Sequence, residues 1–69
     1  MARVIKWTNK MSRETGYVKS VSRARGCFIN TWDKSDAKKY QTDKQIDKDM
    51  QILDEVGETQ NNEFEVEQI

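Results

Sequence analysis

Basic residues alternate with aromatic ones in the first half of this chain, and this is its clearest pattern for binding chemistry. The residues concerned are Arg13, Tyr17, Lys19, Arg23 and Arg25, with Trp7 close by in the sequence. Proteins grip single-stranded nucleic acids in this way, with phosphates on basic side chains and bases stacked on rings. The pattern therefore predicts a face that binds nucleic acid or an acidic partner.

An opposing interpretation of the same residues is structural. The chain contains no nucleic-acid recognition motif, and its pI of about 6.2 is far from that of a basic binding domain. Large aromatic rings bury so much area that a small domain seldom leaves them outside its core. Trp7 and Tyr17 would then pack within the fold, while the basic residues keep turns soluble and protect sheet edges.

Acidic residues gather in the second half, where they predict a negative helix surface for a basic partner. They are Asp43, Asp47, Asp49, Asp54, Glu55 and Glu58, and the predicted partner-binding face consists of Asp47, Asp54, Glu55 and Glu58. Such a helix can imitate a phosphate backbone and so block a nucleic-acid-binding enzyme. Lys44 and Lys48 interrupt the surface, so an ordinary solvated face of mixed charge is the alternative.

Catalytic chemistry finds little support in the residue types. The chain has no His, a single Cys, and glycines only at the isolated positions 16, 26 and 57. It therefore lacks the commonest general base, a Cys pair for zinc and a glycine-rich phosphate loop. The carboxylate pairs Asp43/Asp47 and Asp54/Glu58 would need a pocket to act as acid and base or to hold a metal. We expect no enzyme, no metal, no cofactor and no small-molecule substrate, with Cys27 a small buried side chain.

Length and charge set the scale of the protein. The 69 residues predict one domain over 1–69, with a core built mostly from the six aromatic side chains and one helix. Residues 1–40 carry ten Lys/Arg and three Asp/Glu, and residues 41–69 carry two and nine, so the halves have charges of +7 and −7. The chain shows no signal peptide and no long apolar run, which favours a cytoplasmic protein without a membrane segment.

Four segments have the composition of strands. Residues 2–8, 17–22 and 27–32 are rich in β-branched and aromatic side chains and are joined by short polar turns, which predicts an antiparallel meander. Both faces of the first strand carry apolar residues. Residues 63–69 alternate cleanly, with Phe64 and Val66 on one face and three Glu on the other, while Ile69 falls out of phase.

The helix of the fold is predicted from Thr42 to Gly57. Thr42 and Gln45 have the spacing of a capping box, and Gly57 can adopt the left-handed conformation that closes a helix. Its apolar stripe consists of Ile46, Met50, Leu53 and Val56. The preceding residues 33–40 predict a turn or short helix that Asp33 or Ser35 caps, with a break at Gln41 and Thr42, because Tyr40 is out of phase with the stripe.

The element order is therefore β-β-β-(short α)-α-β, an α+β class with a small antiparallel sheet packed on one main helix. Because Glu65 and Glu67 are acidic and Arg3 and Lys6 are basic, we expect the last strand to lie beside the first.

The second half also resembles small phage and prophage proteins. In those proteins an Ala-Lys-Lys-aromatic segment leads to a Ser/Thr-capped helix and a closing Phe-x-Val/Ile strand. The matching residues are Ala37, Lys38, Lys39, Tyr40, Thr42, Ile46, Leu53, Phe64 and Val66. The resemblance transfers no functional residues, but it implies a mobile-element origin and a role in modulating or inhibiting a host factor. We expect a non-enzymatic protein-interaction module that binds a protein partner or itself, with nucleic-acid binding as the alternative.

Overall fold

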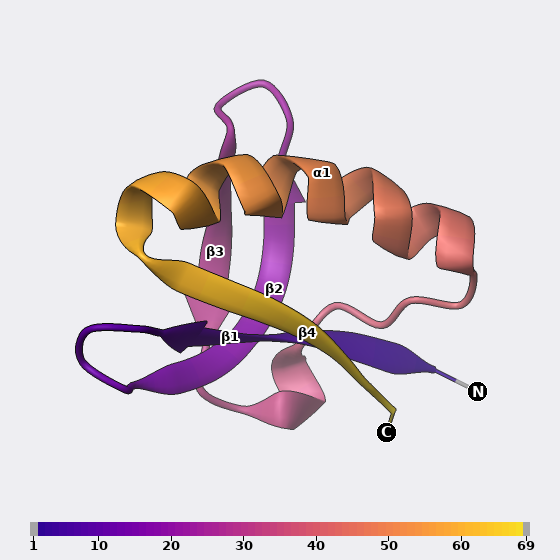
Figure 1. Ribbon diagram of the computed structural model, residues 1–69. Coiled ribbons are helices and arrows are strands. Elements are labelled where there is room, and N and C mark those ends of the chain that lie inside the picture. Colours follow the sequence, from indigo (N-terminus) through magenta and orange to yellow (C-terminus); the bar gives the residue numbers. More distant parts are fainter. Residues whose placement is uncertain (1, 69) are drawn as a thin grey trace.

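The computed structural model describes residues 2–68 and confirms the predicted α+β fold. Its elements are β1 (Arg3–Asn9), β2 (Thr15–Ser22), β3 (Cys27–Thr31), the 3-10 helix η1 (Lys34–Asp36), α1 (Asp43–Gln60) and β4 (Asn62–Gln68). The four strands form one antiparallel sheet in the order β3-β2-β1-β4, and α1 crosses one face of it (Figure 1). Ile69 lies outside the described residues.

The last strand lies beside the first, as the charges predicted. β4 pairs with β1 along its whole length, from Arg3 opposite Gln68 to Asn9 opposite Asn62. Lys6 faces Glu65 across the pair, with 3.9 Å between Nζ and Oε1. Arg3 instead forms an ion pair with Asp43 at the start of α1. Part of the charge difference between the two halves is therefore cancelled by direct contacts.

Helix α1 begins where the sequence predicts. Thr42 is the N-cap residue, and its Oγ1 accepts a hydrogen bond of 3.3 Å from the backbone N–H of Gln45. The Gln45 side chain accepts from the N–H of Gln41, at 3.1 Å, and not from the cap residue itself. The cap is therefore a capping box displaced by one residue. Upstream, Asp33 caps η1 and a non-helical segment separates η1 from α1.

The predicted end of α1 at Gly57 is wrong. The helix continues to Gln60, and Asn61 adopts the left-handed conformation (φ 59°, ψ 38°), with its N–H bonded to the Gly57 carbonyl. A Cβ at position 57 would lie 2.7 Å from the Asn62 carbonyl oxygen and 3.0 Å from the Phe64 ring. The glycine is thus explained by the close approach of β4 to the helix, and not by the helix end.

A bulge in β2 explains why its apolar residues alternate imperfectly. The register with β3 shifts between Val18 and Ser20, which leaves Lys19 as the extra residue. Beyond Tyr17, β2 no longer pairs with β1, and residues 37–40 lie between the two strands. The Lys38 N–H donates to the Val18 carbonyl at 3.0 Å, and Tyr40 exchanges two backbone hydrogen bonds with Arg3.

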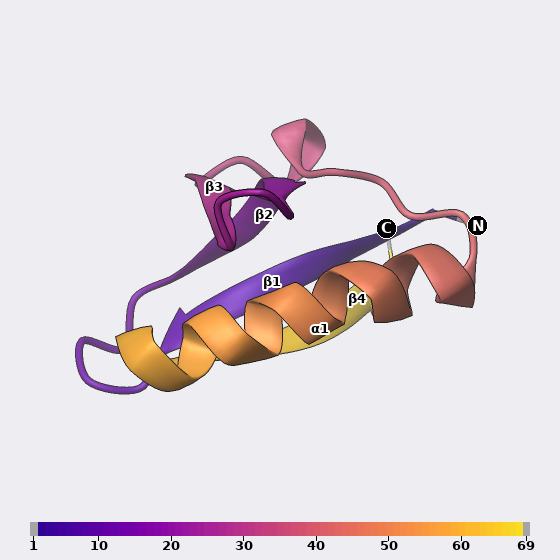
Figure 2. The same cartoon turned by 90° about the horizontal axis from the view of Figure 1, so that it is seen from above.

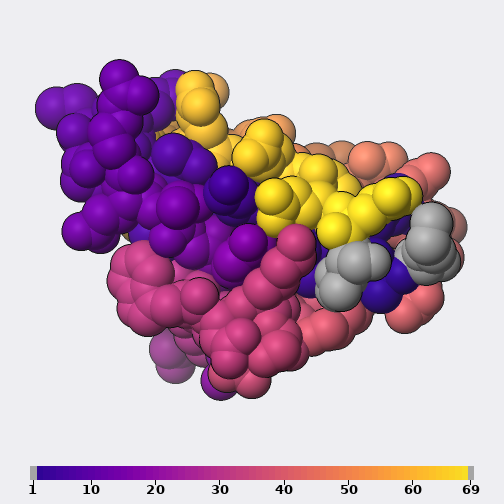
Figure 3. Space-filling model, turned by 90° about the horizontal axis from the view of Figure 1, so that it is seen from below, coloured from indigo at the N-terminus to yellow at the C-terminus, as the bar shows by residue number. Residues whose placement is uncertain are grey.

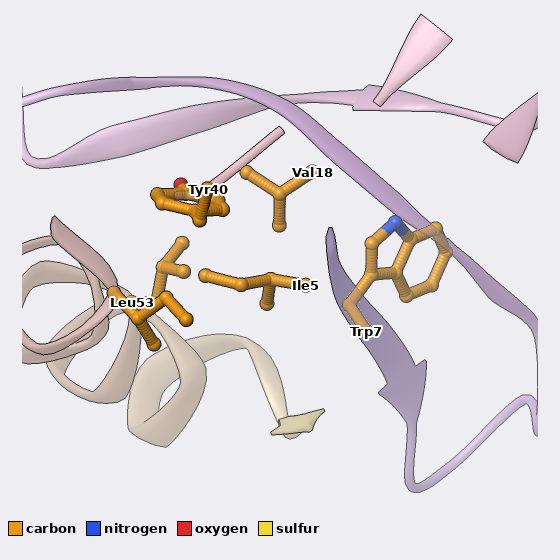
Figure 4. Close-up of a cluster of buried hydrophobic side chains, with 6 residues drawn as sticks. Ile5, Trp7, Val18, Tyr40 and Leu53 are labelled. Atoms are coloured by element: carbon orange, nitrogen blue, oxygen red, sulfur yellow. The ribbon is translucent and has the colours of Figure 1, made fainter. Parts of the chain in front are cut away.

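The core lies between α1 and the sheet. It contains Ile5, Trp7, Val18, Tyr40, Ile46 and Leu53, five of which are labelled in Figure 4. The predicted stripe is confirmed: Ile46, Leu53 and Val56 are buried and Met50 is partly buried. Both faces of β1 are covered, since Val4 and Ile5 are each fully buried. Only some of the aromatic residues are core residues, because Trp32 is 65% exposed.

The helix covers the sheet unevenly. Seen from above, α1 runs along β1 and β4, whereas β2 and β3 diverge from it toward the back (Figure 2). The β2–β3 turn projects beyond α1 (Figure 1). On the opposite side of the molecule, η1 lies against β2 (Figure 3). Part of the β2–β3 hairpin is therefore left without a covering layer.

Candidate functional site

A groove between α1 and β4 collects most of the acidic side chains near the end of the chain. Its volume is about 590 Å³, and its lining residues are Thr8, Lys10, Asp54, Gly57, Glu58, Asn62, Glu63, Phe64 and Glu65. Four acidic residues, Asp54, Glu58, Glu63 and Glu65, therefore contribute to the lining together with Lys10. Because the Phe64 ring points toward α1, the side chains of Glu63 and Glu65 lie on the opposite face of β4, beside Lys10 and Lys6. The apolar part of the lining is the ring of Phe64, which also packs against the core.

The charges of this groove are only loosely neutralised. The Nζ–Oε1 distance is 3.9 Å both between Lys10 and Glu63 and between Lys6 and Glu65, and all of these side chains except that of Lys6 are exposed. Exposed pairs at this distance contribute little free energy. Asp54 and Glu58 form no ion pair within residues 2–68. The groove therefore keeps a negative potential that a positively charged group would neutralise.

The predicted acidic face is only partly brought together in this groove. Asp54 and Glu58 line it, one helical turn apart. Asp47 and Glu55 are exposed on α1 but do not line the groove. The sequence could not identify Glu63 and Glu65 as members of the same site, because that depends on β4 folding back beside α1. Its only signal was the run of three Glu in the last strand.

Asp49 is not part of the acidic surface, as the sequence interpretation had placed it, because its side chain is buried. Its Oδ2 accepts hydrogen bonds from the Tyr40 hydroxyl at 2.5 Å and from Lys38 Nζ at 2.8 Å. Burial, together with the neighbouring carboxylate, raises the pKa of Tyr40 above its ordinary value. These two hydrogen bonds connect residues 37–40 to α1. The helical phase of the sequence indicates the burial of Asp49, because this residue falls on the apolar stripe between Ile46 and Leu53.

The basic residues of the first half do not form one patch. Arg13 lies in the β1–β2 turn, with φ of 67°, whereas Arg23 and Arg25 lie in the β2–β3 turn at the other end of β2. Eight residues of strand separate these turns, a span of roughly 25 Å. Lys19 occupies the bulge between them and is exposed.

The aromatic residues predicted to stack on bases are engaged inside the protein. Trp7 is only 8% exposed, and its Nε1 donates to Asn30 Oδ1 at 2.7 Å. Tyr17 is half-buried, with Lys34 Nζ 5.9 Å from its ring centre. The exposed aromatic ring is Trp32, which packs at a tilt against Trp7 with 5.6 Å between the ring centres. Sequence alone did not single out Trp32.

A second groove, of about 420 Å³, lies beside β3. Its lining residues are Trp7, Asn9, Ser12, Glu14, Cys27, Phe28, Asn30, Trp32, Gln60 and Asn62. Cys27 is half-buried and forms no disulfide. Across residues 2–68 no three His, Cys, Asp or Glu side chains are grouped as metal ligands would be. The lining of this groove therefore consists largely of aromatic and amide side chains, with one carboxylate, that of Glu14.

In comparisons with known proteins, no family model, no curated protein and no solved structure matches this chain. Over the described part of the chain, no helix has both the length and the apolar character needed to cross a membrane. The class of protein that the fold defines is a small α+β domain with two surface grooves, one acidic and one aromatic.

Proposed function

We propose that this protein is a non-enzymatic interaction module that holds a basic, extended segment of a partner protein in the groove between α1 and β4. One observation carries the proposal: Asp54, Glu58, Glu63 and Glu65 all contribute to the lining of this groove, and Asp54 and Glu58 form no ion pair within residues 2–68. Charge complementarity of this kind steers a partner into place and fixes its orientation.

The position of the groove along an edge strand favours a peptide segment as its occupant. β4 is an edge strand, so one side of its backbone has no neighbouring strand. An extended segment can add to such an edge through main-chain hydrogen bonds, with alternate side chains giving specificity. Lys or Arg side chains of that segment would lie beside Glu63 and Glu65 on one face of β4, and the alternate, apolar side chains would contact Phe64 on the other face, next to Asp54 and Glu58.

The biological role that we propose is modulation of a host factor that carries such a segment. This follows from the resemblance of the second half of the chain to small phage proteins, together with the acidic groove. Proteins that bind nucleic acids present basic segments for phosphate contacts. A basic segment that is bound in this groove is no longer available for phosphate contacts, and the protein that carries the segment is inhibited.

The test is a titration of the isotopically labelled protein with a synthetic eight-residue peptide of alternating Lys and Val, followed by NMR at low and high salt. We expect shifts centred on Asp54, Glu58 and residues 62–65, and an affinity that falls as salt increases. The variant Glu58→Lys should weaken binding at least tenfold. Its matched control is Glu55→Lys, an equal charge change on the same helix outside the groove, which should change affinity less than threefold.

The outcome that contradicts the proposal is equal weakening by both variants, or shifts that do not involve the groove. Parallel titrations with single-stranded DNA and RNA oligonucleotides test the alternative function. Salt-sensitive binding that shifts Lys19, Arg23 and Arg25, without peptide binding in the groove, would replace our proposal with nucleic-acid binding.

A further inference from the structure

The two edges of the sheet differ in how they are protected. Edge strands expose unpaired backbone groups, and natural proteins shield them with charged residues. β4 carries three Glu along its length, whereas β3, Cys27–Thr31, carries no charged residue and no Pro. Two of the large exposed apolar side chains belong to this edge: Ile29 is 59% exposed, and Trp32, directly after β3, is 65% exposed.

We propose that β3 is a homodimerisation strand, which pairs with β3 of a second copy in antiparallel orientation about a two-fold axis at Ile29. This inference goes beyond the proposed function and does not depend on the acidic groove. The dimer would join two four-stranded sheets into one continuous sheet. A two-fold axis requires that the same surface be complementary to itself.

The register about Ile29 supplies that complementarity. Antiparallel pairing centred on this residue places Cys27 opposite Thr31 of the second copy. Beyond the strand ends, the turn residues Gly26 and Arg25 of one copy come near Trp32 and Asp33, which follow β3 in the other copy. Both of these charged side chains are exposed. Arg25 forms no ion pair within residues 2–68, and Asp33 accepts hydrogen bonds from Ser35 through Oδ1. By symmetry the dimer gains two such opposite-charge pairs.

The glycine that comes near Trp32 strengthens the choice of a second copy as the occupant. Gly26 has φ of 61°, and a Cβ built on it would meet no atom within 4 Å, so the space beside it is open. Gly26 belongs to the β2–β3 turn directly before β3, and an aromatic ring from a neighbouring copy can cover such an open glycine. On either side of Ile29 the chain therefore has an apolar ring, Trp32, and the open space beside Gly26 that accommodates it. It also has an acid, Asp33, and a base, Arg25.

A cysteine cross-link tests this register directly. In the proposed dimer, native Cys27 lies opposite Thr31 of the other copy, at the Cα separation that a disulfide spans. Two copies of Cys27 are four residues out of register, about 13 Å apart, and cannot be linked. Thr31→Cys, mildly oxidised, should therefore form a covalent dimer. The wild type and the double variant Cys27→Ser/Thr31→Cys should remain uncross-linked.

The non-covalent dimer is measured by sedimentation equilibrium over a range of protein concentrations. Ile29→Lys places two like charges across the axis and should weaken dimerisation at least tenfold, while the thermal unfolding of the monomer is retained. The matched control is Met11→Lys, the same change at an exposed site in the β1–β2 turn, which should leave dimerisation unchanged.

Charge reversal distinguishes pairing in this register from non-specific association through the apolar edge. Arg25→Glu should weaken the dimer several-fold, and Lys44→Glu, an equal change in net charge on α1, should not. A wild type that stays monomeric at millimolar concentration would overturn the proposal. So would a dimer that Ile29→Lys leaves intact, or a Thr31→Cys protein that cross-links only in the absence of Cys27.

Discussion

The half of the sheet formed by β1 and β4 and the half formed by β2 and β3 have different roles in this molecule. β1 and β4 pair along their full length beneath α1, and Lys6 and Lys10 lie beside Glu65 and Glu63 on their outer face. β2 separates from β1 after Tyr17, and its hairpin with β3 projects past the helix (Figure 1). In the half formed by β1 and β4, the side chains that face α1 stabilise the fold, and the acidic groove lies along the outer strand β4. In the half formed by β2 and β3, the large side chains of Ile29 and of Trp32, directly after β3, remain exposed.

The largest effect should come from placing a charge in the covered half. Leu53 is fully buried on the sheet-facing side of α1, so Leu53→Asp should abolish the folded state, because an unpaired buried carboxylate costs several kcal/mol. Circular dichroism during thermal unfolding measures this. Ile29→Lys, in the exposed hairpin, serves as the comparison and should keep a cooperative transition. If Leu53→Asp stays folded and loses partner binding, the stripe is an interface and the comparison between the halves fails.

A glycine at the junction of the two halves should give the next largest effect. A Cβ on Gly16 would lie 2.6 Å from Asn30 Oδ1 and 2.8 Å from the Trp7 ring. Gly16→Ala should therefore disrupt the hydrogen bond between these side chains and destabilise the protein by about 2 kcal/mol. Gly26→Ala at the hairpin tip is the control, since it strains only a positive φ and should cost about 1 kcal/mol. Chemical denaturation of both variants measures the difference, and equal costs would contradict it.

A smaller effect concerns the residues that lie between β1 and β2. Tyr40→Phe removes the hydrogen bond to Asp49 and should lower the free energy of unfolding by about 1–2 kcal/mol. The raised pKa of Tyr40 adds a pH dependence. Its folded-state pKa exceeds the unfolded value of about 10, so its contribution is complete below pH 10 and declines as the pH rises above it.

Denaturation of the wild type and Tyr40→Phe between pH 8 and pH 11 separates these effects. The stability difference between the two proteins should be constant up to about pH 9.5 and should shrink above it. A difference that grows at alkaline pH would show that the hydroxyl is not held in its neutral form.

Local patterns predicted the elements well because their causes are local. The strand segments were placed within two residues of the observed bounds, and Thr42 marked the start of α1. Charge on the first and last strands predicted their pairing. The end of α1 was wrong because Gly57 is needed for contact with β4, which lies outside its own segment.

The surface was predicted less well because exposure depends on strand order and on the reach of the helix. The sequence placed the aromatic residues in the core, but the position of β3 at an edge leaves Trp32 outside. The acidic residues Asp54 and Glu58 were named, yet their neighbours Glu63 and Glu65 became apparent only with the groove. Arg13 and Arg25 are close in sequence but lie at opposite ends of β2.

The contrast between the two sheet edges is tested most directly by backbone amide hydrogen exchange at low and high protein concentration. Pairing through β3 predicts that the amides of residues 27–31 that point away from β2 become more protected as concentration rises. Those at the free edge of β4 should exchange at the same rate in both samples. Exchange in β3 that does not depend on concentration, or protection gained along β4, would contradict the account.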